Sequence, residues 1–169
     1  MAILSIRYLP DPVLRAVAKP VVDFDEALHQ LIDDMFDTMY SVKGVGLAAP
    51  QIGVSLRLAV IDAGKEAKEP LVLVNPELIA AHGKASYTEG CLSVPGAYDT
   101  VVRAEKVTLR AQDKWGKSYE LEASDLLGEC IQHEIDHLNG KLFVDLLSPL
   151  KRSLARRKLE KFKRQKGSA

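Results

Sequence analysis

Two imidazoles and a carboxylate on one short segment have the types and spacing that bind a metal ion and move protons. Residues 132–137 read Gln-His-Glu-Ile-Asp-His and contain the pattern His-Glu-x-x-His. In a helix, residues four apart lie on one face about one turn apart, so His133 and His137 can bind one ion together. Glu134 then reaches the open side of the ion, where a carboxylate can accept a proton from water. The pattern predicts metal-assisted hydrolysis.

A catalytic site of this kind needs a third protein ligand and an open position for water. In the metzincin pattern that ligand would be residue 143, which is Phe143 here and offers no ligand atom. The imidazole and thiol candidates elsewhere are His29, His82, Cys91 and Cys130. The two histidines fit solvated side chains, and Cys130 fits a small buried hydrophobe on the metal-binding helix. Cys91 is slightly favoured, because flanking Gly and Pro residues form a tight loop that can present a thiolate.

Two helices are expected from the spacing of apolar residues. The first begins after Asp25, and Gly44 is placed to end it as a left-handed cap. Its apolar positions are Leu28, Leu31, Ile32, Met35, Phe36, Met39 and Tyr40. The second begins near Ser124 as N-cap and runs to about Asn139, with Gly140 beyond it, so it carries the His-Glu-x-x-His pattern.

The strands are expected to be short. Residues 56–61 and 71–74 fit two of them, and 107–111 with 118–121 fit a hairpin. These strands do not alternate regularly with helices, which favours an α+β fold over a doubly wound sheet. We predict short, mostly antiparallel strands around a central helix bearing the His-Glu-x-x-His motif, plus a C-terminal helix.

The composition of the 169 residues, 47% hydrophobic and 27% charged, is typical of one globular domain. We expect a catalytic body at 1–148 and a basic helical extension of the same domain at 149–169. Residues 151–166 hold nine Lys and Arg against Glu160 alone, which predicts an anionic partner. With two cysteines, no apolar run long enough for a membrane span and no signal-peptide pattern, we expect a cytoplasmic protein without a membrane partner.

Three segments together resemble the signature motifs of peptide deformylases. They are 44–51 (Gly-Val-Gly-Leu-Ala-Ala-Pro-Gln), 89–93 (Glu-Gly-Cys-Leu-Ser) and 132–137. The resemblance extends over nearly the whole chain and points to the bacterial form with a C-terminal helix. It implies removal of the formyl group from the N-formylmethionine that begins new bacterial chains, giving formate and a free amine.

The resemblance also implies a role for individual residues. Cys91, His133 and His137 would be the metal ligands, and Glu134 the acid and base. The Gln51 amide and the Leu92 backbone N–H would be oxyanion donors. The resemblance implies iron(II) as the ion, with zinc, nickel or cobalt as replacements, and the ligand set alone does not decide among them.

The substrate is expected to lie along the first motif. The bare backbone at Gly44 and Gly46 would let an extended peptide approach and pair. The methionine side chain would enter an apolar pocket, for which the candidates are Val45, Leu126 and Cys130. Glu129 either tunes His133 from one turn away or is a solvated charge at the helix edge.

The expected partners are formylated nascent peptides and, through the basic C-terminal helix, the ribosome near the exit of the nascent chain. The other reading of that helix is a solvated, partly frayed face. We expect a monomer. Two rival functions remain at this point, a zinc endopeptidase and a non-enzymatic ribosome-associated module.

Overall fold

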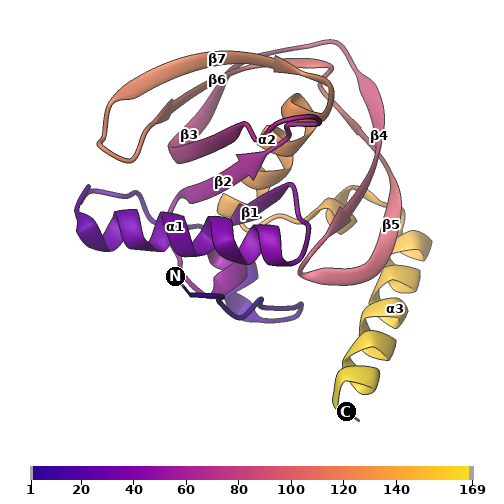
Figure 1. Ribbon diagram of the computed structural model, residues 1–169. Helices are drawn as coiled ribbons and strands as arrows, with labels where there is room; N and C mark the ends of the chain where they lie inside the picture. The colour runs from indigo at the N-terminus through magenta and orange to yellow at the C-terminus, as the bar shows by residue number, and fades with distance from the viewer. Residues whose placement is uncertain (1, 168–169) are drawn as a thin grey trace.

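The computed structural model of the chain describes residues 2–167, which form two sheets and three α-helices (Figure 1). The α-helices are α1 (Glu26–Ser41), α2 (Asp125–Leu138) and α3 (Pro149–Gly167), and three short 3-10 helices are η1 (Pro12–Leu14), η2 (Ala49–Ile52) and η3 (Phe143–Leu146). The strands are β1 (Gly46–Ala48), β2 (Leu58–Asp62), β3 (Pro70–His82), β4 (Ala85–Cys91), β5 (Val94–Arg103), β6 (Lys106–Gln112) and β7 (Ser118–Ser124).

Both sheets are antiparallel throughout. The five-stranded sheet has the order β1-β2-β3-β6-β7, and β4 pairs with β5 in a separate two-stranded sheet. Figure 1 shows α1 in front of the five-stranded sheet, α2 behind it and α3 beside β5. The predicted α+β fold, with antiparallel strands around the motif-bearing helix and a C-terminal helix, is confirmed.

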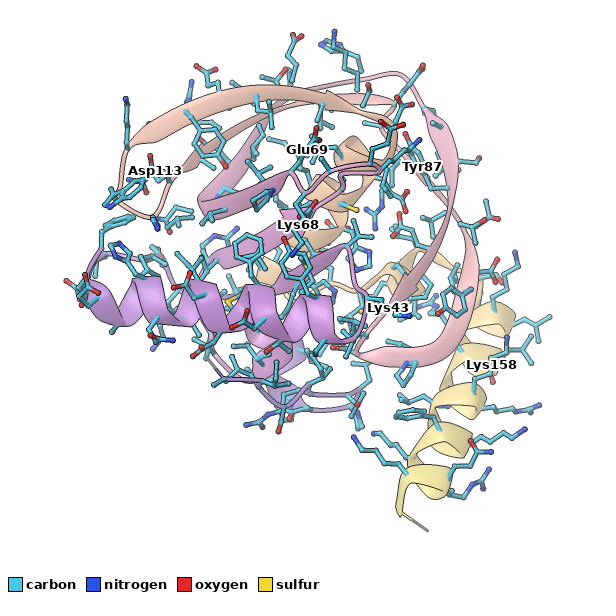
Figure 2. All side chains as sticks on the ribbon, in the orientation of Figure 1. Lys43, Lys68, Glu69, Tyr87, Asp113 and Lys158 are labelled. Carbon is cyan, nitrogen blue, oxygen red and sulfur yellow. The ribbon has the colours of Figure 1, made fainter. Side chains whose placement is uncertain are left out.

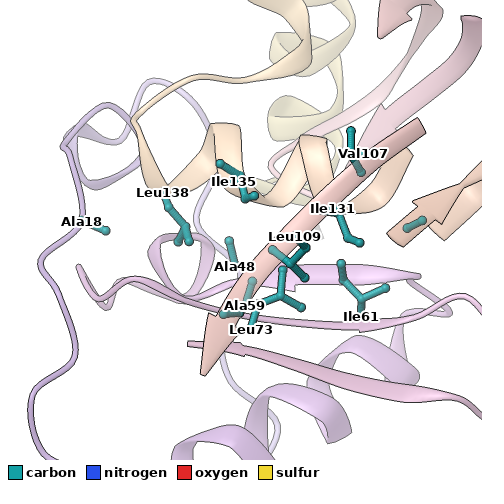
Figure 3. Packing of buried hydrophobic residues seen from close by; sticks show 12 residues of the cluster. Ala18, Ala48, Ala59, Ile61, Leu73, Val107, Leu109, Ile131, Ile135 and Leu138 are labelled. Atoms are coloured by element: carbon teal, nitrogen blue, oxygen red, sulfur yellow. The ribbon is translucent and has the colours of Figure 1, made fainter. Parts of the chain in front are cut away.

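The position of α2 is set by an apolar face that packs on the five-stranded sheet (Figure 3). Ile131, Ile135 and Leu138 lie on this face and join strand residues such as Leu73 and Leu109 in one buried cluster. Their spacing of three and four residues is that of a single helical face. The remaining face of α2, which carries the predicted ligands, is turned toward the end of β4.

The ends of α1 agree with the prediction at one end and correct it at the other. The Asp25 side chain caps the first turn by accepting a hydrogen bond from the Leu28 N–H at 3.0 Å. At the other end the left-handed residue is Lys43, with φ of 56°, so the prediction of Gly44 as that residue is wrong. Gly44 instead follows it and donates its N–H to the Met39 carbonyl at 2.9 Å, as the next residue of a Schellman ending does.

The ends of α2 lie where they were predicted. Ser124 occupies the N-cap position, although its side chain makes no capping hydrogen bond. Gly140 follows the helix with φ of 76°, and a β-carbon there would lie 2.4 Å from the Arg15 carbonyl oxygen. Only glycine therefore fits this turn.

The predicted strands match β2, β3, β6 and β7, and the predicted hairpin is the antiparallel β6–β7 pair. Three strands were not predicted, namely β1, β4 and β5. Cys91 was expected in a tight loop, but it is the last residue of β4. A two-residue turn, Leu92-Ser93, then leads to Val94 of β5.

The C-terminal helix α3 packs on β5 and shares a core with the body. Ala155 and Leu159 are buried in one cluster with Val94 and Val101 of β5 and with Phe143. The predicted extension 149–169 begins with α3, while Ser168 and Ala169 lie outside the described residues, as does Met1 of the predicted 1–148 body. Within residues 2–167 no helix combines the length and apolar character needed to cross a membrane.

Candidate active site

Three potential ligand atoms converge where β4 ends against α2. The Cys91 Sγ lies 3.3 Å from the His137 Nε2, which lies 3.1 Å from the His133 Nε2. All three atoms lie within 4.8 Å of one another. The two histidines come from successive turns of α2, and the cysteine comes from the end of β4. The three residues that the resemblance implied as ligands therefore meet in the structure.

Two of the three spacings, and the chemistry of all three atoms, fit a metal ion. Tetrahedral coordination with metal–nitrogen bonds of about 2.05 Å and metal–sulfur bonds of about 2.3 Å separates ligand atoms by about 3.3 to 3.6 Å. The two shortest separations here are close to that range. The buried Nδ1 of His137 has no hydrogen-bond partner among residues 2–167. No hydrogen bond on that side of the ring therefore explains its orientation. One sulfur and two imidazole nitrogens suit divalent iron, cobalt, nickel or zinc.

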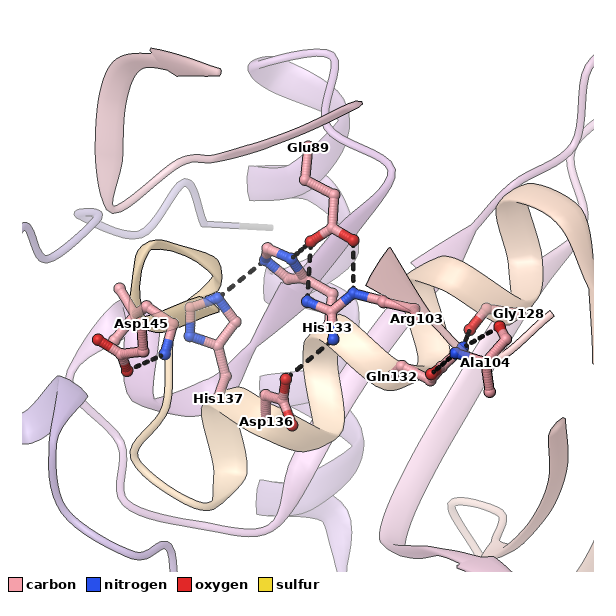
Figure 4. A network of polar contacts seen from close by, with 10 residues as sticks. Glu89, Arg103, Ala104, Gly128, Gln132, His133, Asp136, His137 and Asp145 are labelled. Carbon is pink, nitrogen blue, oxygen red and sulfur yellow. Dashed lines mark hydrogen bonds and ion pairs between the residues drawn. The ribbon is translucent and has the colours of Figure 1, made fainter. Parts of the chain in front are cut away.

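A buried ion-pair network holds the His133 ring in place (Figure 4). The Glu89 carboxylate accepts a hydrogen bond from the His133 Nδ1 at 2.8 Å and pairs with the Arg103 guanidinium. Arg103 also donates to Asp136 at 2.9 Å. Because Nδ1 carries the proton for Glu89, the His133 Nε2 presents its lone pair to the ligand cluster.

The charges in this network suit its buried position. Burial raises the pKa of Glu89, but the hydrogen bonds and charges of Arg103 and His133 outweigh it and hold the net pKa below its usual value. The sequence analysis assigned no role to Glu89 or Arg103. A signal was available for the first, because Glu89 belongs to the same motif as Cys91, residues 89–93.

Glu134 lies beside the ligand cluster with an unused carboxylate oxygen. The residue is 3% exposed, and no group in the described part of the chain hydrogen bonds its Oε1. Burial raises the pKa of Glu134 to about 7, against the lowering influence of His133. A buried carboxyl group with this pKa can both accept and donate a proton near neutral pH.

The two predicted oxyanion donors lie next to Cys91. Gln51, in η2, is 2% exposed and accepts a hydrogen bond at its Oε1 from the Ala48 N–H at 3.0 Å. That bond turns the Gln51 amide nitrogen toward the Cys91 Sγ at 3.5 Å and the Ser93 Oγ at 3.2 Å. Leu92 occupies the turn between β4 and β5, directly after Cys91.

A cleft of about 490 Å³ opens onto these groups. It is lined by all five residues predicted to bind substrate, Gly44, Val45, Gly46, Leu126 and Cys130, together with Gln51, Leu92 and the site residues Cys91, His133 and Glu134. Lys43, which directly precedes the first motif, also lines the cleft and is labelled in Figure 2. Burial raises the pKa of the Cys130 thiol, so this side chain stays neutral and suits an apolar wall.

The remaining candidate ligands lie elsewhere. His29 has its Nε2 2.8 Å from the Lys114 carbonyl oxygen, and His82 is exposed at the end of β3.

Glu129 is partly exposed and lines the cleft, and burial raises its pKa to about 7. It is therefore not the freely solvated charge that was one of the two expectations.

Comparison with known proteins decides the family. The family model described as polypeptide deformylase matches residues 3–153. The chain belongs to the peptide deformylase family. A crystal structure of a peptide deformylase from Legionella pneumophila is 65% identical, covers 99% of each chain and superposes with a TM-score of 0.97. Peptide deformylases of Alkalilimnicola ehrlichii (55% identity, 98% of this chain and 93% of the relative) and Hahella chejuensis (56%, 95% and 96%) are similarly close.

This deformylase is accordingly a hydrolase that removes the N-formyl group from nascent peptides. The family is one of metalloenzymes, and the Cys91, His133 and His137 cluster is the corresponding candidate site. Membership disfavours both rivals, the zinc endopeptidase and the non-enzymatic module.

Sequence reasoning missed several residues of the deformylase cleft, three of which come from far along the chain. Ile6, Tyr8 and Phe162 line it, although they come from the two ends of the chain. No local pattern could have joined Tyr8 to Phe162, because their rings meet only through the packing of α3.

Proposed function

We propose that Cys91, His133 and His137 hold one divalent ion, iron(II) in the cell, which zinc, nickel or cobalt can replace. When bound, such an ion acts as a Lewis acid that polarises the formyl group and lowers the pKa of water. The observation that supports this assignment is the buried Glu134 carboxylate beside three converging ligand atoms, with an Oε1 that has no hydrogen-bond partner among residues 2–167.

In this proposal Glu134 moves the proton. Its free Oε1 takes a proton from the attacking water and later gives it to the leaving nitrogen. The Gln51 amide and the Leu92 N–H stabilise the negative charge that develops on the formyl oxygen. Each such donor typically contributes about 3 kcal/mol to lowering the barrier.

The substrate peptide is proposed to pair with the free edge of β1. This strand is at the end of its sheet, with β2 as its partner on one side. Because the Val45 carbonyl is used by the Asp62 N–H at 2.8 Å, strand alternation turns the Gly46 backbone groups to the other side. The methionine side chain then enters the part of the cleft lined by Val45, Leu126 and Cys130.

The test is the Glu134→Gln variant, which keeps the size of the side chain and removes its basicity. Formate release from a formyl-Met peptide should fall about 10²- to 10⁴-fold, while metal content and thermal unfolding stay near the wild type. Glu122→Gln, on the exposed part of β7, is the matched control. Unaltered activity of Glu134→Gln, or equal cleavage of unformylated peptides by the wild type, would contradict the proposal.

We further propose that residues 149–169 are a basic extension of the catalytic domain that docks to the ribosome. Three exposed cations on α3, Arg156, Arg157 and Lys161, form no side-chain hydrogen bond or ion pair with the other residues of the range 2–167. By contrast Lys151 pairs with Asp99 at 3.1 Å. Figure 2 shows Lys158 on the same helix. Such a surface suits the phosphates of ribosomal RNA, and binding to it would depend strongly on salt.

Neutralising the three cations tests this docking without deleting the helix, whose residues Ala155 and Leu159 belong to the core. Arg156→Gln, Arg157→Gln and Lys161→Gln combined should weaken ribosome co-sedimentation and reduce its salt dependence. The control removes three exposed lysines elsewhere, Lys65, Lys84 and Lys117, as Gln. Equal binding by both triple variants would defeat the idea.

A monomer and a cytoplasmic location are part of the same proposal, and sedimentation and cell fractionation test them.

A further inference from the structure

The cleft extends past the metal-ligand cluster to a pair of aromatic rings from opposite ends of the chain. Tyr8 precedes η1 and Phe162 lies on α3, and both line the same cleft as His133 and Glu134. Their ring centroids are 5.5 Å apart with an angle of 57° between the planes. Both side chains are only partly buried, so part of each ring is available to a ligand.

The Tyr8 side of this pair is tied directly to the catalytic residues. The Arg7 N–H donates to the Gln51 carbonyl oxygen at 2.7 Å, and the Leu9 N–H donates to the Ser93 carbonyl oxygen at 3.2 Å. The backbone on both sides of Tyr8 is thus hydrogen bonded to segments that contain a proposed oxyanion donor. The Tyr8 ring therefore has a defined position relative to the reacting centre.

The Phe162 side is held by the packing of α3. Leu159, one turn earlier, is buried against the β5 core. The Lys163 ammonium donates to the Leu9 carbonyl oxygen, and the Lys166 ammonium lies 3.3 Å from the Tyr8 hydroxyl and 5.0 Å from its ring centroid. These contacts join the end of α3 to the N-terminal segment, so Phe162 is a fixed wall rather than a free side chain.

We propose that Tyr8 and Phe162 form an aromatic subsite that binds an apolar or aromatic side chain at the third or fourth residue of the formylated peptide. The inference rests on the proposed function, which places the formyl group at the Cys91, His133 and His137 cluster. The substrate is a peptide, so its backbone must leave that cluster along the cleft. Fixed aromatic rings lose little conformational freedom on binding and offer large apolar surfaces.

This subsite gives α3 a role in substrate selection. The helix contributes Phe162 to the wall, and its Lys166 contacts the hydroxyl and the ring of Tyr8. The preference for particular side chains at the third or fourth peptide residue is therefore expected to depend on α3. This helix begins at Pro149, twelve residues after His137.

The test compares formyl-Met-Ala-Phe and formyl-Met-Ala-Ala-Phe with the same peptides ending in Ser. In the wild type, kcat/KM should favour the Phe peptide over its Ser counterpart about 3- to 10-fold for at least one of the two lengths. In Phe162→Ala this ratio should fall to near one, and in Phe162→Leu it should be intermediate. Leu154→Ala, on an exposed part of the same helix, is the matched control and should keep the wild-type ratio.

The outcomes separate this subsite from the proposed function. If the wild type releases no formate from any of the peptides, the proposed function fails and the subsite fails with it. If formate is released but the ratio is near one at both lengths, or Phe162→Ala keeps the wild-type ratio, the subsite alone is wrong. Should Phe162→Ala fail to fold, the ratio in Phe162→Leu decides, because a value equal to that of the wild type overturns the inference.

Discussion

Gly46 and Glu134 are so close that a β-carbon on Gly46 would lie 2.5 Å from the Glu134 Oε2. A carbon atom cannot approach an oxygen that closely, so either β1 or the carboxylate would have to move. At Gly44 the nearest atoms to an added β-carbon lie at 3.4 Å, which is near ordinary contact. Both glycines were expected to clear the way for a peptide, but Gly46 also makes room for the proposed proton carrier.

Gly46→Ala should therefore reduce catalysis by displacing Glu134. A misplacement of about 1 Å can lower the rate about 100-fold, so we expect kcat/KM to fall by about that factor. The loss of kcat/KM in Gly44→Ala should be at least about tenfold smaller, because the nearest atoms to its added methyl group belong to Leu92 and Met39 at ordinary contact distance. Steady-state formate release gives the rates, and metal content and circular dichroism check that both proteins are loaded and folded. Equal losses in the two variants would contradict the explanation.

Glu89→Gln should weaken both metal binding and the fold. The amide would place an N–H₂ group against the donors of His133 or Arg103, where Glu89 now accepts from both. Loss of such an outer partner lowers metal affinity about 10- to 100-fold, and breaking a buried ion pair costs about 3–5 kcal/mol of unfolding free energy. Asp136→Asn is the control, since Asp136 contacts Arg103 but not His133 and is 30% exposed. Chelator competition measures the metal affinity, and urea unfolding measures the stability. Comparable losses in Glu89→Gln and Asp136→Asn would contradict the explanation.

The two cysteines should respond differently to replacement by serine. Cys91→Ser removes the sulfur that lies 3.3 Å from His137, so metal affinity should fall more than about 100-fold, beyond the effect of an outer partner. Cys130 lines the cleft but does not belong to the ligand cluster, so Cys130→Ser should keep its metal. Metal analysis of protein purified without oxygen measures both. Equal metal content in the two variants would show that Cys91 is not the third ligand.

Helices α1 and α2 could be predicted because each has one apolar face, whereas β4 and β5 could not. Glu89 is buried in β4, yet in sequence it reads as a solvent-facing residue. The cost of burying it is offset by Arg103, which lies fourteen residues later in the sequence and on another strand. Strands are recognised in a sequence by alternation of apolar, buried residues with polar, exposed ones. A buried polar residue with a partner distant in sequence breaks that pattern.

The length of β3 was underestimated for a different reason. The apolar run ends at Val74, where prediction stopped, but the strand continues to His82. Asn75 adopts a positive φ of 49°, and the pairing with β6 shifts register between Val74 and Glu77. An irregularity of this kind interrupts alternation without ending the strand. The metal site was easier, because its residues lie in contiguous motifs.

The ion pair of Arg15 and Asp145 connects the segment before α1 to η3. It should make the free energy of unfolding depend on pH in the acidic range. Burial raises the pKa of Asp145, but the Arg15 guanidinium and the Leu142 N–H outweigh it, so the folded pKa lies below the usual 3.8. A depressed carboxyl pKa gives stability that is complete above the unfolded pKa and is lost as pH falls through the folded pKa. Asp145→Asn should thus lose about 1 kcal/mol of unfolding free energy at pH 7, because both side chains are partly exposed. The difference from the wild type should begin to narrow only below about pH 4. Urea unfolding between pH 3 and 7 measures it, with Arg15→Gln and the double variant completing a cycle. A coupling energy that stays constant over this range would show that charge on Asp145 is not what stabilises this contact.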